Sequence, residues 1–269
     1  MLVLREVVDQ VATVTLNRPE ARNALSGALT SELDDVITEL DGRDDVACII
    51  LTGADPAFCA GVDLKALSTE PREAQQERQS GPLAHLGFLP PHETPVIGAI
   101  NGPTVTGGLE LALCCDFLIA SERARFADTH ARVGAMPGAG LTIRLPQLIG
   151  IDRARRMSLT GDYVDAETAL DWGLVVEVVS HDSLVSRARE IATTIAAIPA
   201  EYVQELRRGY AQMGSLLGPE AVAAEHRWSR TWMAERFDQA RLSSERETIV
   251  ARGREQTQRG AQDTGLDPA

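Results

Sequence analysis

The first 17 residues alternate between apolar and polar side chains, which is the two-residue period of a β-strand. The alternation predicts two strands joined by a turn near Asp9 and Gln10. The residues that carry it are Leu2, Leu4, Val11, Thr13 and Thr15. Pro19 closes this pair of strands, because proline cannot donate to a strand ladder.

Further along, helical and strand-like patterns alternate. Ser26 is a candidate N-cap for a helix, and apolar residues then recur at helical spacing over residues 29–40. Continuous apolar runs predict buried strands at residues 47–52, 95–101, 117–120 and 174–179. Helices are predicted at residues 107–115, 141–149, 152–159 and 184–198. The polar stretch over residues 69–80 is typical of a mobile loop or a solvated helix.

Interleaved strands and helices up to about residue 180, followed by helices alone, predict an α/β fold with a helical C-terminal section. We divide the chain into a core over residues 1–199, a helical section over residues 200–254 and a polar tail over residues 255–269. The composition of the tail predicts disorder.

Composition and charge exclude several classes of protein. The formal net charge is −13, which repels nucleic acid and anionic membranes, so a polyanionic ligand needs a local basic patch. Lys65 is the single lysine among 26 basic residues.

Apolar runs are too short to span a bilayer, and the first residues lack the features of a secretory signal. The four cysteines form neither a disulfide framework nor a zinc pattern, so we expect a cytoplasmic protein.

Gly107 and Gly108 follow a buried strand and precede an apolar helix. The first amides of a helix have no partner within it and carry the positive end of its dipole, which suits a developing oxyanion. The alternative is a glycine pair that serves only as a tight turn. Glu110 follows within one turn. It either faces water at the helix start or is a buried carboxyl of raised pKa that works as an acid or base.

Four segments in this order resemble the enoyl-CoA hydratase/isomerase, or crotonase, family. They are AFCAGVDLK (residues 57–65), TGGLELALCCDFLIASERARF (residues 106–126), GAMPGAGLTIRLPQLIG (residues 134–150) and LTGDYVDAETALDWGLVVEVV (residues 159–179). The resemblance implies a spiral of ββα turns with a C-terminal helical trimerisation section. It also implies a homotrimer or a dimer of trimers, for which Trp228, Trp232 and Met233 suit an apolar interface.

The resemblance also implies residue roles. The backbone amides of Val62 and Gly107 form the family's oxyanion hole for a thioester carbonyl, and Glu110 matches its first catalytic glutamate. Coenzyme A and substrate contacts fall on Arg22, Ala24, Ala60, Asp63, Leu64, Lys65 and Gly108. Phe237 cannot be matched to the phenylalanine that the family often carries near its end.

The chain departs from the family at His130, where a hydratase has its second glutamate. His130 either replaces that glutamate, or lines the pocket of an enzyme with one glutamate and a different reaction, or has no chemical role. In the first case Asp128 is available to orient it, since two residues in an extended segment place both side chains on the same side.

The resemblance therefore implies an acyl-CoA enzyme that stabilises a thioester enolate, with enoyl-CoA hydratase as the leading assignment. The alternatives are an isomerase or decarboxylase of the same family, or a catalytically silent acyl-CoA-binding protein. No metal or redox cofactor is implied, since coenzyme A belongs to the substrate.

Overall fold

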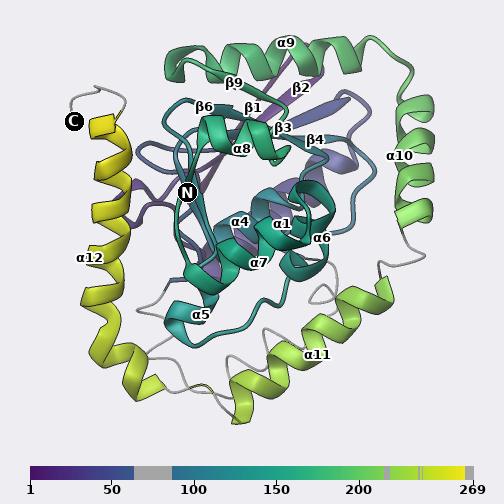
Figure 1. Ribbon diagram of the computed structural model, residues 1–269. Coiled ribbons are helices and arrows are strands. Elements are labelled where there is room, and N and C mark those ends of the chain that lie inside the picture. The colour runs from purple at the N-terminus through teal and green to yellow at the C-terminus, as the bar shows by residue number, and fades with distance from the viewer. Residues whose placement is uncertain (64–86, 215–218, 236, 238, 264–269) are drawn as a thin grey trace.

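The computed structural model describes residues 1–63, 87–214, 219–235, 237 and 239–263 (Figure 1). Its main sheet has six strands in the order β1-β2-β3-β4-β6-β9, and only β1 and β2 pair antiparallel. The strands are β1 Val3–Val8, β2 Val11–Leu16, β3 Cys48–Gly53, β4 Val96–Ile100, β6 Phe117–Ser121 and β9 Glu177–Val179.

The N-terminal hairpin follows the alternation in the sequence. Asp9 and Gln10 form its turn with φ of 50° and 64°, and this left-handed geometry matches the twist of the two flanking strands. Val11, Val14 and Leu16 are buried in the sheet. The prediction of two strands joined at this turn is confirmed.

A second sheet of three short strands was not predicted from the sequence. It consists of β5 Pro103–Val105, β7 Arg125–Ala127 and β8 Val164–Asp165, with β5 parallel and β8 antiparallel to the central β7. Segments of two or three residues are too short to show a period, so only long-range pairing reveals them.

The helices of the core are α1 Gly27–Asp41, α4 Gly107–Ala112, α5 His130–Val133, α6 Leu141–Ile149, α7 Ile151–Thr160, α8 Ala166–Trp172 and α9 Leu184–Ala196. Short 3₁₀ helices lie at η1 Pro19–Ala21 and η2 His181–Ser183. Ser26 caps α1 as predicted, since its side chain accepts from the Leu29 amide. The helix predicted over residues 107–115 is shorter than expected and ends at Ala112.

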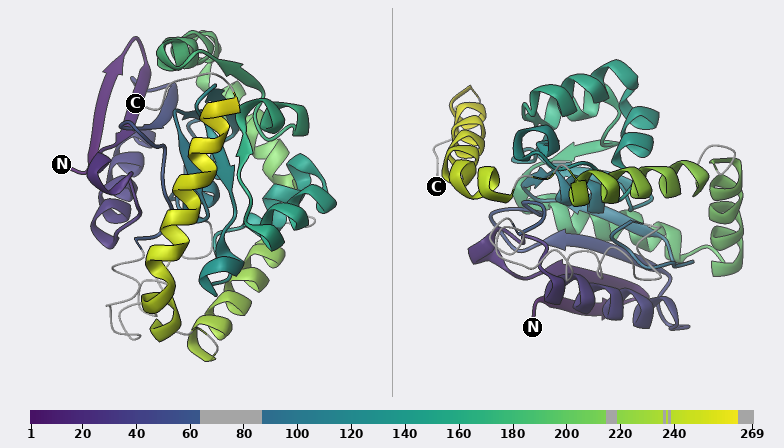
Figure 2. Two further views of the ribbon diagram at one scale, coloured as in Figure 1. Left: turned by 60° about the vertical axis from the view of Figure 1, so that its left-hand side comes forward. Right: turned by 90° about the horizontal axis from the view of Figure 1, so that it is seen from below.

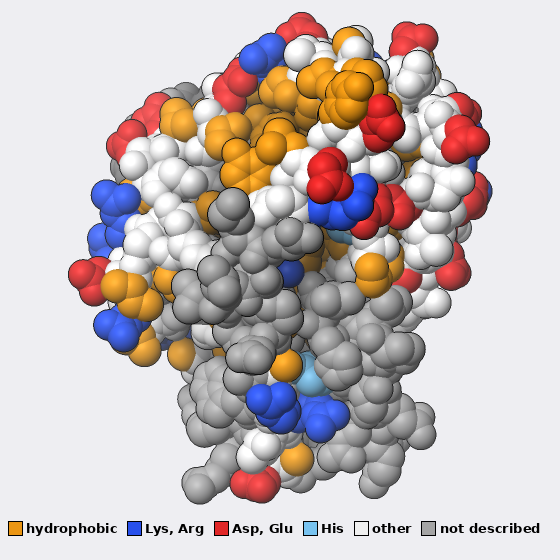
Figure 3. Space-filling view, turned by 90° about the vertical axis from the view of Figure 1, so that its right-hand side faces the viewer, with side chains coloured by type: hydrophobic (Ala, Val, Ile, Leu, Met, Phe, Trp, Pro, Cys, Tyr) orange, Lys and Arg blue, Asp and Glu red, His pale blue; other side chains and the backbone are white. Residues whose placement is uncertain are grey.

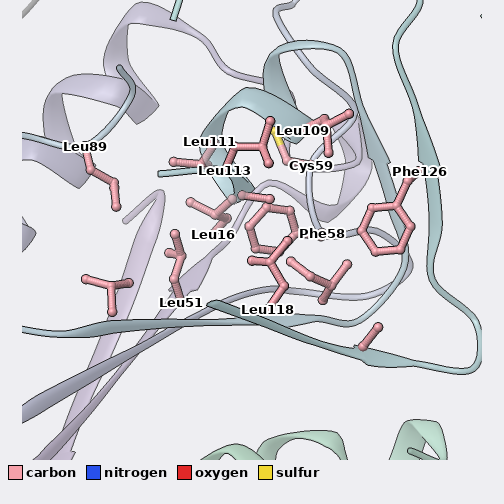
Figure 4. Packing of buried hydrophobic residues seen from close by; sticks show 14 of the residues in the cluster. Leu16, Leu51, Phe58, Cys59, Leu89, Leu109, Leu111, Leu113, Leu118 and Phe126 are labelled. Atoms are coloured by element: carbon pink, nitrogen blue, oxygen red, sulfur yellow. The ribbon is translucent and has the colours of Figure 1, made fainter. Parts of the chain in front are cut away.

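Helices cover both faces of the main sheet (Figure 1). On one face, Leu184, Ala188 and Ala192 of α9 pack on alternate residues of the strands, such as Cys48 and Ile50. The residues between these, such as Ile49 and Leu51, enter the larger cluster on the other face. In that cluster the ring of Phe58 lies close to leucines of the sheet and of α4 (Figure 4).

The C-terminal section is helical from residue 200, as predicted, and forms α10 Ala200–Gly214, α11 Pro219–Glu235 and α12 Gln239–Asp263. α10 and α12 lie on opposite sides of the core, and α12 runs along its outside (Figure 2). Because α12 continues to Asp263, most of the segment predicted as a disordered tail from residue 255 is helical. The side chains of Trp228 and Trp232 lie outside the described residues.

Phe237 and Leu242 are buried against Val133 and Ala135, with Met233 packed beside them. The C-terminal section thus covers α5, the short helix that begins at His130. Across the described residues, no helix has the length and apolar character needed to cross a membrane. All four cysteines are free thiols.

Candidate active site

Gly107, the first residue of α4, faces Val62 at close range. A Cβ atom placed on Gly107 would lie 3.2 Å from Cγ2 of Val62 and 3.3 Å from its amide nitrogen. Any residue with a side chain would therefore crowd the space between these two backbone amides. Glycine keeps the space open for an atom that approaches both N–H groups.

The backbone pairing of Val62 turns its amide into that space. Val62 forms an isolated parallel bridge with Leu25, in which Leu25 donates to the Gly61 carbonyl at 2.8 Å and accepts from the Asp63 amide at 3.0 Å. Those two bonds occupy the side that faces Leu25, so the N–H of Val62 points the other way. Within the described residues, neither the Val62 nor the Gly107 N–H donates to a protein acceptor.

Glu110 is buried and points into the protein, so the alternative of a solvated carboxylate at the helix start is wrong. Its side chain is 4% exposed. Oε1 accepts hydrogen bonds from the amides of Gly138 at 3.1 Å and Ala139 at 2.8 Å. These two donors fix the plane of the carboxylate, and its other oxygen lies 3.7 Å from Nε2 of His130.

His130 is held from behind by Asp128. One oxygen of Asp128 lies 2.6 Å from Nδ1 of His130 and 3.1 Å from its backbone nitrogen. Burial raises the pKa of the Asp128 carboxyl, but hydrogen bonds from His130 and Ser158, with the charge of His130, hold that pKa below its usual value. An ionised Asp128 only accepts, so Nδ1 carries the proton and Nε2 faces Glu110.

The contact between Asp128 and His130 comes from a turn, whereas the sequence interpretation assumed an extended segment. Thr129 has φ of −106° and ψ of 15°, which bends the chain so that the Asp128 side chain reaches the backbone two residues on. The predicted pairing is therefore present with a different local geometry. Asp128, His130 and Glu110 form a continuous row of carboxylate, imidazole and carboxylate, all three buried.

The residues expected near coenzyme A lie in two segments joined by Asn23. Its side-chain nitrogen donates to the carbonyls of Ala54 at 2.8 Å and Ala57 at 2.7 Å, and its side-chain oxygen accepts from the Arg18 amide at 2.8 Å. Asn23 and Arg22 both have positive φ, a conformation that asparagine tolerates well. The Arg22 side chain is exposed at this bend.

Four other expected contact residues have defined surroundings. The Ala60 amide donates to the Arg22 carbonyl at 3.0 Å. The Arg18 side chain donates to the Ala24 carbonyl at 2.8 Å and forms an ion pair with Asp63 at 3.1 Å. Gly108 is packed so tightly that a Cβ atom would lie 2.1 Å from the Cys59 carbonyl oxygen. Its glycine is therefore explained by packing. Leu64 and Lys65 lie outside the described residues.

Sequence reasoning missed two threonines that join the halves of this site. Thr106 precedes Gly107, Thr129 precedes His130, and their hydroxyl oxygens lie 2.6 Å apart. No local signal marks either residue, because threonine is common in strands and turns. In the part of the chain that the structure describes, no group of three His, Cys, Asp or Glu side chains is arranged to hold a metal ion.

A model of the family described as enoyl-CoA hydratase/isomerase matches residues 6–244. The chain belongs to this family. The short-chain-enoyl-CoA hydratase of Clostridium acetobutylicum is 39% identical to it over 198 residues, which are 72% of this chain and 75% of that protein. The (E)-benzylidenesuccinyl-CoA hydratase of Thauera aromatica is 40% identical over 212 residues, 77% of this chain and 81% of that protein.

Solved structures of family members show the same fold. A crystal structure of an enoyl-CoA hydratase from Mycobacterium smegmatis superposes with a TM-score of 0.78 at 48% identity, covering 87% of this chain and 99% of that one. The Mycobacterium tuberculosis H37Rv enzyme gives 0.79 at 46% identity, covering 87% and 100%. The predicted family and its α/β crotonase fold are confirmed.

Proposed function

We propose that this chain hydrates 2-enoyl-CoA thioesters, with Glu110 and His130 as its two acid–base groups. The observation that carries the proposal is the 3.7 Å separation of Glu110 Oε2 and His130 Nε2. One water molecule can reach both atoms at ordinary hydrogen-bond lengths of about 2.8 Å. The relatives named as hydratases support the same reaction class.

The paired amides of Val62 and Gly107 would hold the thioester carbonyl. As charge develops on that oxygen, two preorganised N–H donors stabilise the enolate, and each such donor contributes roughly 3–4 kcal/mol to lowering the barrier. Valine serves at the first position because only its backbone N–H is used. The positive end of the α4 dipole adds to the attraction.

Glu110 and His130 together account for every proton that moves during the hydration. The Glu110 carboxylate takes a proton from the water as the water oxygen bonds to C3 of the enoyl group. The electron pair of the C2–C3 double bond moves onto the thioester as the enolate. Protonated His130 then gives its Nε2 proton to C2, and the proton on Glu110 passes to His130 to restore the starting state.

Asp128 makes histidine suitable at a position where related hydratases use glutamate. Two glutamates that share one proton carry a net charge of −1. An ionised Asp128, a protonated His130 and an ionised Glu110 carry the same net charge and also hold one transferable proton. Histidine in place of the second glutamate thus preserves the net charge of −1 that the reaction requires, because Asp128 supplies the second negative charge.

For the substrate's coenzyme A, we propose that Arg22 and Lys65 contact its phosphates. Arg22 is exposed beside the segment that leads to Val62, and Lys65 follows that segment by three residues. Two cations at this place would offset the overall charge of −13 locally. Ala24, Ala60, Asp63, Leu64 and Gly108 would shape the same binding surface, and the reaction needs no cofactor besides the substrate's coenzyme A.

We also propose that the strands and helices of the core form the ββα spiral of the family, and that the chain assembles in the cytoplasm as a homotrimer or a dimer of trimers. Hydrophobic side chains gather on the side of the molecule that carries α10 (Figure 3). Tyr202, Leu206 and Tyr210 are 63–74% exposed along one face of α10 and suit a subunit contact. Light scattering of the purified protein measures the assembly.

The decisive experiment is a panel of acyl-CoAs tested for both turnover and binding. It includes a short 2-enoyl-CoA, a 3-enoyl-CoA and a carboxyacyl-CoA. Loss of the conjugated enoyl absorbance, with a hydroxyacyl product that contains ¹⁸O from labelled water, is expected for the first substrate. Turnover of only the second or third would instead identify an isomerase or a decarboxylase, and tight binding without turnover would identify a binding protein.

A further inference from the structure

Thr106 has a backbone conformation that threonine rarely adopts. Its φ is 54° and its ψ is −108°, in a region that disfavours side chains branched at Cβ. This residue turns the chain from β5 into α4, so its conformation sets the direction of the next N–H group, that of Gly107. A strained conformation persists only where the surroundings hold it in place.

Residues 127–129 supply that support. The Thr106 amide donates to the Ala127 carbonyl at 2.8 Å, and Oγ1 of Thr106 accepts from the Thr129 amide at 3.0 Å. The two threonine hydroxyls lie 2.6 Å apart, so one donates to the other. The pair is half-buried, and removal of either hydroxyl would break it and so release the turn.

The same residues continue the pairing of two strands. β5 and β7 run parallel with Val105 opposite Ala127, and the chain then continues to Thr106 and Gly107 on one side and to Thr129 and His130 on the other. The hydroxyl pair therefore lies between the amide proposed to bind the carbonyl and the imidazole proposed to transfer the proton. Each threonine directly precedes one of these two residues.

We infer that Thr106 and Thr129 are positioning residues which, through their paired hydroxyls, fix the Gly107 amide in place relative to His130. This inference rests on the proposed function, because it assigns a purpose to the geometry of the same site. Neither threonine touches the reacting atoms. A reaction that needs the carbonyl oxygen and C2 held at once is sensitive to small displacements between their two protein partners.

The test measures carbonyl polarisation separately from turnover. A dienoyl-CoA chromophore absorbs at longer wavelength when amide donors polarise its thioester carbonyl, and this red shift requires binding but no hydration. The variants are Thr106→Val and Thr129→Val, which lose the hydroxyl at nearly constant shape, and the double variant. Thr106→Ser and Thr129→Ser keep the hydroxyl, and Thr52→Val removes a buried threonine hydroxyl that bonds elsewhere, to the Ala99 carbonyl.

Each valine variant should lose much of the red shift and roughly tenfold in kcat, with KM within about twofold, because only transition-state alignment is affected. The double variant should be no worse than Thr106→Val, because that change already removes both the hydroxyl pair and the acceptor of the Thr129 amide. The serine variants and Thr52→Val should keep the red shift and kcat. Full red shift and kcat in the valine variants, or independent losses that multiply, would overturn the inference.

Thr106→Gly keeps the test decisive if a valine variant fails to fold. Glycine adopts positive φ without strain, so this variant should fold while lacking the hydroxyl. It should show the same reduced red shift, and a normal red shift would show that the hydroxyl pair is dispensable. A native protein that gives no red shift overturns the inference, whereas one that shifts the spectrum but hydrates nothing contradicts only the proposed function.

Discussion

Asp128 binds His130 through a single carboxylate oxygen, which lies 2.6 Å from Nδ1 of the ring and 3.1 Å from the backbone nitrogen. Two donors from the same residue converge on one acceptor, so both the ring orientation and its tautomer are determined. Nε2 is then the only ring nitrogen that can face Glu110. This relationship makes the row of Asp128, His130 and Glu110 a unit whose members can be tested one at a time.

Glu110→Gln should lower turnover of every active substrate by ~100-fold or more, which is typical of the loss of a general acid or base. The glutamine oxygen can still accept from the Gly138 and Ala139 amides, so the fold should survive. Acyl-CoA binding should also survive, because the oxyanion donors are backbone groups. Steady-state kinetics and calorimetric binding measure the two effects, with exposed Glu122→Gln as the control. Unchanged turnover would show that the catalytic group lies elsewhere.

His130→Ala should lower turnover by an amount comparable to Glu110→Gln. In the native protein kcat should fall as pH rises through the titration of an imidazole, because His130 must be protonated to donate to C2. Asp128 and Glu110 are charged groups that face the ring in the described part of the chain. The variant should lose this limb of the pH profile. His130→Glu combined with Asp128→Asn, which restores two glutamates at the net charge of −1, should hydrate a short enoyl-CoA. A small effect of His130→Ala would leave an enzyme with one catalytic glutamate.

Asp128→Asn should reduce kcat more than it changes KM, because the ring loses the partner that orients it. It should also lower the free energy of unfolding at pH 7 by ~1–3 kcal/mol, the cost of a lost buried hydrogen bond to a charged group. The pKa of Asp128 is lower in the folded than in the unfolded chain, so its contribution is present above the unfolded value and is lost as pH falls through the folded value. Urea unfolding measures the difference in free energy of unfolding between the native protein and the variant, and this difference should be smaller in acid than at pH 7.

Asp34→Asn should stabilise the protein above neutral pH. Burial, with the nearby charge of Asp35, raises the pKa of Asp34 to about 6. A raised folded pKa means that stability is greatest below the unfolded value of 3.8 and is lost as pH rises through about 6. After allowance for solvent screening of this half-buried group, we expect a gain of ~1 kcal/mol at pH 8 and none at pH 4. Thermal melts at both pH values measure this gain in stability. The control is Asp35→Asn, which changes the exposed neighbour and should give a smaller gain.

Lys65→Ala should weaken acyl-CoA affinity and leave the turnover of bound substrate nearly unchanged. A phosphate contact far from the reacting carbons contributes equally to the ground state and the transition state, so the loss appears in KM and not in kcat. Raising the salt concentration should reduce the difference between variant and native protein. Equal acyl-CoA affinity of the two proteins would exclude the proposed contact. So would an equal loss of affinity for substrate analogues that lack the phosphates.

The amino-acid sequence alone determined the family, most strands and helices of the core and the pair Gly107 and Glu110. These features depend on local order: a two-residue alternation forms β1 and β2, Ser26 starts α1, and a glycine pair after a buried strand opens α4. It also identified His130 as the departure from the family pattern, because a single substitution within a motif is visible without coordinates.

Only the tertiary structure decided what these residues do together. The three-residue strands β5 and β7 exist through pairing between residues some twenty positions apart, and that pairing places Thr106 beside Thr129. The direction of the Val62 amide depends on its bridge to Leu25, and the separation of Glu110 from His130 depends on the Asp128 turn. Local sequence patterns do not predict these contacts, because each contact joins groups that come together only when the core folds.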